Sequence, residues 1–474
     1  MTSNRDFSEH YEDAPHIVRK VAIVAFIGAL GGLLFGLDQG FINGSLPLIR
    51  VDLGLSTDQA AFFSGVLAWA AAVGAFIAGW VARGFGRKNT ILLAALAFAT
   101  CTIVGAFAQS YEVLLGSRIL LGLAVGTAAF VVPLYLSEIA PTHMRGGVIA
   151  MYQLMITIGI FLVFVSNASI QFALGGQHQS WRLMLGIISI PAIVMLLAGL
   201  SLPRSPRWLM LKRRPEQARE VLHSTRASHE EINAELNEMQ ASLAQADRKA
   251  LHLFGKGFFW KVLLLGVSLQ ALQQLSGINS VIYYSTEIFG KAGIANAAVA
   301  TVIVGFVNML TTILAVAFVD RWGRKPILYF GLIVMALMLF AVATVFRYEA
   351  AGGDLGDLGQ VMMVGAILTY ICAFAISLGP VVWIMCAEIF PLEGRELGVT
   401  VTTIANWIFT AIVVQYSEII LHQIGGAILF YGFAACCVVG LGLVFLFAPE
   451  TKRVSLEDLE ERLRAGVRLK KIGA

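Results

Sequence analysis

Apolar runs of about 20 residues, the length that crosses a bilayer as an α-helix, follow one another along most of the chain and are separated by short polar clusters. This pattern predicts an all-α membrane protein. The twelve transmembrane helices are expected at residues 20–46, 58–82, 90–109, 113–137, 147–170, 182–202, 258–287, 297–319, 326–346, 361–387, 397–421 and 424–447.

One long interval, residues 203–256, does not have a membrane-like pattern. Its charged and apolar residues recur at helical spacing, which predicts short surface helices. They would form either a solvated linker or a helical pad packed under the bundle. The expected organisation is a leader, an N-terminal six-helix half, this linker, a C-terminal six-helix half and a tail, with bounds 1–19, 20–202, 203–256, 257–447 and 448–474.

An internal repeat supports the division into halves. RGFGRK at 83–88 recurs as DRWGRK at 320–325, and SEIAPTHMR at 137–145 recurs as AEIFPLEGR at 387–395. PRSPRW at 203–208 shows a weaker similarity to PETK at 449–452. Two six-helix halves duplicated in the same orientation are the plan of many secondary transporters, whose substrate site lies between the halves near the bilayer midplane.

The composition also indicates a membrane protein, and the distribution of its charged residues predicts the orientation of the chain in the membrane. The 474 residues are 58% hydrophobic and only 14% charged, with a net charge of +4. Lys and Arg gather in alternate loops, in the interval 203–256 and in the tail, so the positive-inside rule predicts that both termini are cytoplasmic. We expect no nucleic-acid partner. The five cysteines lie in apolar segments without metal-ligand spacing and are interpreted as small core residues.

The run GALGGLLFGLDQGFINGS at 28–45 carries a carboxylate inside an apolar helix. Its glycines recur every fourth residue, which lets a neighbouring backbone approach, and Asp38 points away from that stripe. A charge at this depth costs about 2.5–3.5 kcal/mol on insertion scales. Arg118, in SRILLGLAVG, is the expected partner at a compatible depth. The two would form either a fixed ion pair or a proton-coupling site, and we favour the latter because a proton can make or break the pair.

The predicted helix 258–287 carries a cluster of neutral polar residues in LQALQQLSGINSVIYYS at 269–285. Gln270 and Gln274 lie one turn apart, as do Asn279 and Tyr283, and Gly277 can loosen the helix between them. Amides donate and accept hydrogen bonds, which suits an uncharged ligand rich in hydroxyl groups. The alternative is that these amides join helices to one another.

The predicted helix 361–387 contains GPVVW at 379–383. Pro380 removes a backbone donor, so a break or kink is expected there. Trp383 could offer its aromatic face to the C–H side of a sugar ring, or serve as an interfacial anchor. Weaker signals come from isolated polar residues on other helices, Gln153, Asn308 and Asn406.

The repeated motifs GRK and E-x-x-P-x-x-x-R place cations near Glu138 and Glu388 at predicted helix ends. These charges could set topology alone. The duplicated glutamates favour an ion-pair latch that holds the cytoplasmic side shut, in which several pairs act together because a single surface pair contributes only about 0–1 kcal/mol.

Six motifs in order, PLYLSEIAPTHMRG, PRSPRWL, QQLSGINSVIYYS, DRWGRKP, GPVVWIMCAEIFP and PETK, resemble those of the sugar porter family of the major facilitator superfamily. The resemblance runs from about residue 20 to the end of the chain. MYQLMITIGI, LLFGLDQG and the ending PETKRVSLEDLEERL are most similar to bacterial galactose– and arabinose–proton symporters. The resemblance implies the major facilitator fold and import of a monosaccharide with a proton by alternating access. The sugar would be a hexose such as galactose or glucose, or a pentose such as arabinose.

The resemblance also implies residue roles. The sugar would be contacted by Gln153, Gln273, Gln274, Asn279, Asn308, Trp383 and Asn406, with Phe374 lining the pocket. Tyr283 and Tyr284 would close the site from outside, and Asp38 with Arg118 would couple the proton. The cytoplasmic latch would comprise Arg87, Glu138, Arg145, Arg324, Glu388 and Arg395. The implied protein is a multi-pass monomer in the inner membrane of a bacterium, with the proton as coupling ion, no catalytic residue, no metal and no cofactor.

Two positions depart from the family's motifs. Arg83 stands where the first GRK motif usually has an acid, and Arg204 stands where PRSPRWL usually has an acid or Asn. Both add positive charge, so we expect the ion pairs of the latch there to be weaker or to have different partners.

Three other functions fit the sequence less well. A facilitative sugar uniporter would be expected to carry a neutral residue at Asp38. A sugar sensor that does not transport would be expected to have a longer cytoplasmic tail. No nucleophile–base pair or metal-ligand pattern supports an enzyme.

Overall fold

The computed structural model describes residues 15–141, 144–175, 177–246, 255–294, 296–353, 356–391, 394–452, 454 and 456–472. These residues form α-helices and a 3-10 helix and contain no strand. In chain order the helices are α1 (Pro15–Leu53), α2 (Thr57–Phe85), α3 (Arg87–Ala106), α4 (Tyr111–Ile139), α5 (Arg145–Ala173), α6 (Ser180–Ile187), α7 (Ser189–Gly199), α8 (Pro206–Leu211), α9 (Pro215–His223), α10 (His229–Ala246), α11 (Gly257–Leu275), α12 (Ile278–Lys291), α13 (Ala297–Trp322), α14 (Arg324–Ala350), α15 (Gly356–Ile376), α16 (Leu378–Ile389), α17 (Arg395–Gln423), α18 (Gly426–Phe447), α19 (Leu456–Arg464) and η3 (Leu469–Lys471).

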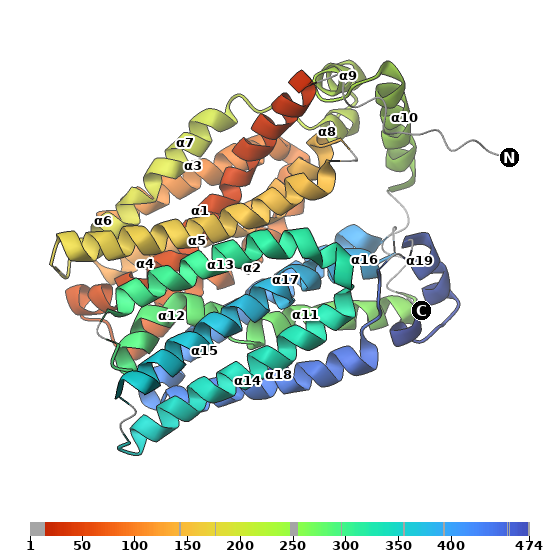
Figure 1. The fold of residues 1–474 in the computed structure, drawn as a ribbon. Helices are drawn as coiled ribbons and strands as arrows, with labels where there is room; N and C mark the ends of the chain where they lie inside the picture. The colour runs from red at the N-terminus through yellow and green to blue at the C-terminus, as the bar shows by residue number, and fades with distance from the viewer. Residues whose placement is uncertain are drawn as a thin grey trace.

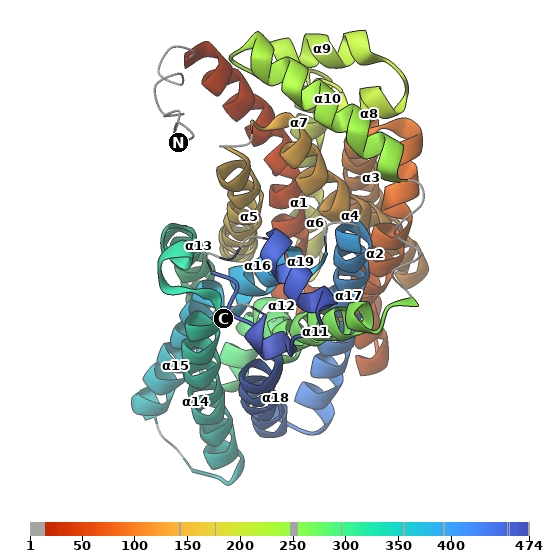
Figure 2. The same cartoon turned by 90° about the vertical axis from the view of Figure 1, so that its right-hand side faces the viewer.

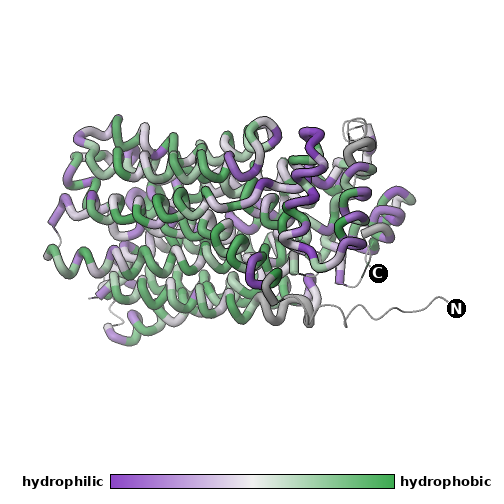
Figure 3. Tube along the Cα trace, turned by 90° about the horizontal axis from the view of Figure 1, so that it is seen from above, coloured by the Kyte–Doolittle hydropathy of each residue, from purple (hydrophilic) through white to green (hydrophobic). Residues whose placement is uncertain are grey.

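The expectation of twelve transmembrane helices is confirmed: within the described residues, twelve helical spans are long and apolar enough to cross a membrane. They run side by side through the bundle in Figure 1. Hydrophobic residues fill its length, whereas hydrophilic residues gather at its ends (Figure 3). This distribution fits a protein that spans a bilayer with polar ends in water.

Three of the long spans are each divided into two helices; in the first of them α6 and α7 meet at Ile188. α11 and α12 meet at Gly277, which has φ 91° and so allows the expected loosening of that helix. α15 and α16 meet at Ser377 rather than at Pro380, because the ring of Pro380 blocks the carbonyl one turn earlier and then fits the first turn of α16.

α1 differs from its expected form in two respects. It continues past residue 46 to Leu53, and its backbone turns out of helical geometry at Asn43 and Gly44. Pro47 explains the bend, since its ring excludes a helical bond to the Asn43 carbonyl. That carbonyl instead accepts a hydrogen bond of 2.8 Å from Asn167 Nδ2 on α5.

The glycine stripe of α1 brings its backbone against α5, as expected. A side chain at Gly36 would overlap the carbonyl oxygen of Ile156, and one at Gly32 would lie 2.5 Å from the carbonyl oxygen of Tyr152. Gly159 on α5 approaches the carbonyl of Leu33 in the same way. The close contact fixes α1, and with it Asp38, against its neighbours.

The interval between the two long helix series forms a pad with its own small core. α8, α9 and α10 bury Trp208, Leu209, Leu222 and Ile232 against one another. Arg226 ties this pad to the end of α4, donating to the Ile139 carbonyl at 2.8 Å and pairing with Glu235 at 2.6 Å. These contacts support the helical pad over the solvated linker.

We call α1–α7 the first helix set and α11–α18 the second. Within them α1 packs against α5, α2 against α4 and α14 against α18, while α2 with α17 and α5 with α13 join the two sets. Figure 2 looks onto the end that carries α8, α9, α10 and α19, which we call the pad end. The sets are consistent with the two predicted halves, whose exact bounds stay a prediction.

Candidate functional site

A fully buried ion pair lies inside the first helix set. Arg118 Nη1 on α4 contacts Asp38 Oδ1 on α1, and both side chains have 0% exposure. The rings of Phe41 and Phe63 flank the guanidinium at 5.7 and 5.5 Å. The structure thus brings together the two residues expected to couple the proton.

The pair leaves several of its polar atoms unused. Asp38 Oδ2 and Arg118 Nε and Nη2 are buried and have no hydrogen-bond partner among the described residues. Removing one member of a buried pair is costly, and unpaired buried groups add to that cost. Asp38 Oδ2 is therefore an oxygen that a proton could occupy without first displacing a protein donor.

Next to this pair, carboxamides form a continuous hydrogen-bonded chain, which we call the amide chain. Asn279 Nδ2 donates to Gln274 Oε1 at 2.5 Å, and Gln274 Nε2 donates to Gln273 Oε1 at 3.2 Å. Asn406 Nδ2 on α17 donates to Gln273 Oε1 at 2.8 Å and to Gln270 Oε1 at 2.6 Å. The broken helix α11–α12 and α17 thus bring together four expected sugar contacts, Gln273, Gln274, Asn279 and Asn406.

The amide chain reaches the first helix set through Gln39, a residue that the sequence analysis did not single out. Gln39 Nε2 donates to Asn279 Oδ1 at 2.6 Å, and Gln39 directly follows Asp38 on α1. The candidate sugar site therefore contacts Gln39, the residue that follows the candidate proton-coupling residue Asp38 in the sequence. A second polar residue beside Asp38 in an apolar run was the available signal.

The other expected sugar contacts are linked to the amide chain less directly or not at all. The ring of Phe374 lies against Gly379, whose carbonyl accepts from Gln273 at 3.2 Å. Gln153 on α5 is half-buried, Asn308 on α13 is buried, and Trp383 on α16 is 38% exposed. The hydrogen bonds found for the described residues do not join these three side chains to the amide chain.

The two tyrosines expected to close the site are both buried on α12. Their rings lie 6.3 Å apart, and the Tyr284 hydroxyl donates to the Val414 carbonyl on α17 at 2.8 Å. Tyr284 is thus anchored to a neighbouring helix of its own set. Tyr283 has 2% exposure.

At the pad end, two equivalent groups of three side chains occupy corresponding positions in the repeat. In the first set, Arg87 pairs with Glu138 at 2.8 Å, and Ser205 Oγ donates to Glu138 Oε2 at 2.5 Å.

In the second set, Arg324 pairs with Glu388 at 3.0 Å, and Thr451 Oγ1 donates to Glu388 Oε2 at 2.5 Å. Glu450 accepts from the backbone N–H groups of Arg324 and Lys325, both at 3.0 Å, at the N-terminus of α14. We call the two groups the pad-end triads. Four of the six expected latch residues belong to them, and each pair joins helices of the same set.

The remaining latch residues are less informative. Arg395 is the first residue of α17, and the side chain of Arg145 lies outside the described residues. Arg83, one of the two departures from the family pattern, pairs with Glu396 of α17 at 3.6 Å. Both partners are about two-thirds exposed, at 64% and 69%, so this contact between the sets is weak. Arg204, the other departure, stacks over Trp208 in the pad.

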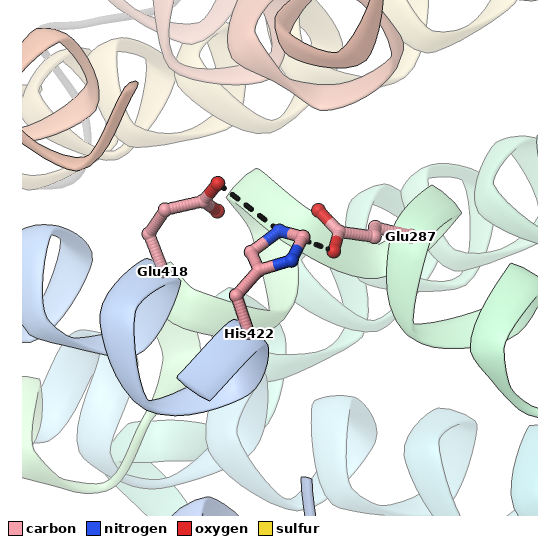
Figure 4. A group of neighbouring side chains, drawn as sticks. All are labelled: Glu287, Glu418 and His422. Carbon is pink, nitrogen blue, oxygen red and sulfur yellow. Dashed lines mark ion pairs between the residues drawn. The ribbon is translucent and has the colours of Figure 1, made fainter. Parts of the chain in front are cut away.

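The end opposite the pad carries a charged cluster that the sequence analysis missed. Figure 4 shows Glu287 of α12 and Glu418 of α17 on either side of His422. His422 Nε2 lies 2.8 Å from Glu287 Oε1 and 3.2 Å from Glu418 Oε1. Arg50 of α1 contacts Glu418 at 3.2 Å and His422 at 2.9 Å, and Lys291 pairs with Glu287 at 3.2 Å.

We call these five residues the opposite-end cluster. Arg50 comes from the first helix set and the other four from the second, so the cluster joins the sets. The ligand atoms of Glu287, Glu418 and His422 lie within 4.8 Å of one another, close enough to hold a metal ion. Arg50 and Lys291 already neutralise the two carboxylates, which favours an ion-pair cluster over a metal site.

Asn43 forms a second connection between the sets near this end. Its Nδ2 donates to Ser285 Oγ at 2.5 Å and to the Ile282 carbonyl at 2.7 Å, and its Oδ1 accepts from Thr286 Oγ1. Trp69 on α2 adds a bond of 3.0 Å to Gln415 on α17. The sets are therefore held together at the end opposite the pad.

Twelve membrane-length helices in two sets, with a buried carboxylate–arginine pair and an amide chain between them, have the architecture of a secondary transporter. The chain belongs to the family described as Sugar (and other) transporter, which matches residues 24–463. The resemblance noted from the motifs is thereby confirmed.

Individual relatives cover nearly the whole chain. The galactose–proton symporter of Escherichia coli (strain K12) is 41% identical over 455 residues, which are 95% of this chain and 96% of the relative. The arabinose–proton symporter of the same strain is 38% identical over 454 residues, 95% of each chain. Among solved structures, the proton:xylose symporter XylE bound to 6-bromo-6-deoxy-D-glucose is 28% identical, with a TM-score of 0.78 over 94% of this chain and 99% of XylE. The fold is therefore that of the major facilitator superfamily.

Proposed function

We propose that this protein is a secondary transporter that imports a monosaccharide together with a proton. The observation that carries the proposal is the contact of the amide chain with Gln39, beside the buried Asp38–Arg118 pair. Amides in a buried site recognise hydroxyl groups without requiring charge on the ligand. The relatives named for galactose, arabinose and xylose support a sugar of hexose or pentose size.

In this proposal Asp38 carries the coupling proton. When ionised it pairs with Arg118; when protonated it releases the guanidinium and permits the two helix sets to rearrange around the sugar. Sugar contact by Gln153, Asn308, Phe374 and Trp383 and closure by Tyr283 and Tyr284 are parts of the same proposal. The protein would act as a monomer in a bacterial inner membrane, with the pad end in the cytoplasm.

Reconstituted vesicles test this function. Labelled galactose uptake is measured with and without an imposed pH gradient, acid outside, and unlabelled arabinose, xylose and glucose are added as competitors. We expect accumulation above the external concentration only with the gradient. One pH unit can drive about tenfold accumulation per proton at equilibrium. Uptake that stops at equal concentrations in both conditions would instead identify a facilitative uniporter.

A further inference from the structure

Gln39 lies where the two helix sets meet the amide chain. Its side chain is buried, with 7% exposure, and its Nε2 donates to Asn279 Oδ1 at 2.6 Å. Among the hydrogen bonds of the described residues, this is the one that joins the amide chain to the first helix set. The other hydrogen bonds of the amide chain in the described residues are made within α11, α12, α16 and α17.

The two amide atoms of Asn279 are therefore both used by protein groups: Oδ1 by Gln39 and Nδ2 by Gln274. A sugar hydroxyl that donates to Asn279 Oδ1 could supply the hydrogen bond that the Gln39 amide supplies here. Because Asn279 is buried, loss of both donors would leave an unpaired acceptor between the sets.

We propose that the Gln39 carboxamide substitutes for a sugar hydroxyl on Asn279 when the transporter is empty, and so permits the empty protein to change its orientation. The inference rests on the proposed function and adds a positioning residue to it. A symporter must return without sugar after each delivery, and its two sets must then close around an unoccupied site. Gln39 supplies at that moment the inter-set hydrogen bond that the sugar supplies in the loaded protein.

Two transport modes separate this role from a structural one. Exchange of labelled for unlabelled galactose, at saturating concentration on both sides of a vesicle, uses only the loaded protein. Net efflux of galactose into sugar-free buffer also requires the empty protein to return. Gln39→Leu keeps the approximate volume of the side chain and removes its donor.

We expect Gln39→Leu to leave the exchange rate within about twofold of wild type and to slow net efflux about tenfold, the effect of one lost buried hydrogen bond on a rate. Gln171→Leu is the matched control, because Gln171 Nε2 donates to the Gly44 carbonyl at 3.0 Å inside the first set, away from the amide chain. Its ratio of exchange to net efflux should stay at the wild-type value.

Two results would overturn the inference. If exchange and net efflux fall together in Gln39→Leu, the side chain has a general structural role; if neither changes, the bond to Asn279 has no part in the return step. Failure of the wild-type protein to exchange galactose, arabinose, xylose or glucose would contradict the proposed function itself, and is seen before any variant is compared.

Discussion

Asn279 is the side chain on which the candidate site depends most. It accepts from Gln39 of one helix set and donates to Gln274 of the other, at 2.6 and 2.5 Å. In a site built from neutral amides, specificity comes from matching donors to acceptors, so each unpaired group has a cost.

Asn279→Ala should weaken galactose binding by about 1–3 kcal/mol, because a sugar hydroxyl and Gln274 both lose a partner. Isothermal titration calorimetry on the purified protein measures this. Gln59→Ala is the control: Gln59 caps the start of α2 with Ser56 and takes no part in the amide chain. Unchanged affinity in Asn279→Ala would remove Asn279 from the site.

The Asp38–Arg118 pair gives a second prediction at the same scale. Arg118→Leu should lower the free energy of unfolding by about 3–5 kcal/mol, because it leaves a buried carboxylate without its counter-charge. Arg182→Leu, which breaks the half-buried pair with Asp52, should cost less. Denaturant titrations followed by tryptophan fluorescence compare the two.

Combining Arg118→Leu with Asp38→Asn should restore part of the lost stability, since no buried charge then remains. If Arg118→Leu alone is as stable as the wild-type protein, the pair has no energetic coupling and the ion-pair assignment is wrong.

At the scale of elements, the charged groups at the two ends of the bundle differ in what they join. The pad-end triads hold helices of one set together, whereas the opposite-end cluster crosses from α1 to α12 and α17. In the proposed transport cycle, a change of orientation would break the opposite-end cluster, while the triads would move as rigid parts of their sets. The latch role proposed for the triads would act through the helix ends that they position.

Arg50→Gln should loosen the opposite-end cluster and shift the population toward the state that is open at that end, because Glu418 and His422 lose their partner from the other set. A cysteine introduced at Ser280, a buried residue of α12 whose hydroxyl has no hydrogen-bond partner among the described residues, with the native cysteines replaced by alanine, reports this as faster labelling by a membrane-impermeant reagent. Lys291→Gln removes a charge of the same cluster that stays within the second set. Equal labelling in both variants would show that Arg50 does not hold the end closed.

Glu388→Gln tests the latch at the other end. The variant weakens the bond to Arg324 and leaves Thr451 able to donate, so the position of α14 relative to α16 should become less fixed. A cysteine at Gln153, with the native cysteines replaced by alanine, should then be labelled faster from the pad end. No change in labelling would favour a role for these charges in topology alone.

For the molecule as a whole, much of the fold was predictable because run length and hydropathy depend on the local sequence alone. The bend at Asn43 was missed, although Pro47 stands one helical turn beyond it. The amides Gln274 and Asn279 were predicted from their spacing on one helix, and Gln273 from the family resemblance. Gln39 and the opposite-end cluster were not, because their partners come from other helices and no local pattern records such contacts.

The central claim is that the charge of Asp38 changes during transport, and Asp38→Asn tests it most directly by fixing a neutral side chain beside Arg118. In vesicles the variant should still exchange labelled for unlabelled galactose but should lose accumulation driven by a pH gradient, acid outside. Wild-type protein in the same vesicles should do both. If Asp38→Asn still accumulates galactose against its gradient when the pH difference is imposed, Asp38 is a structural partner of Arg118 and the proton is carried elsewhere.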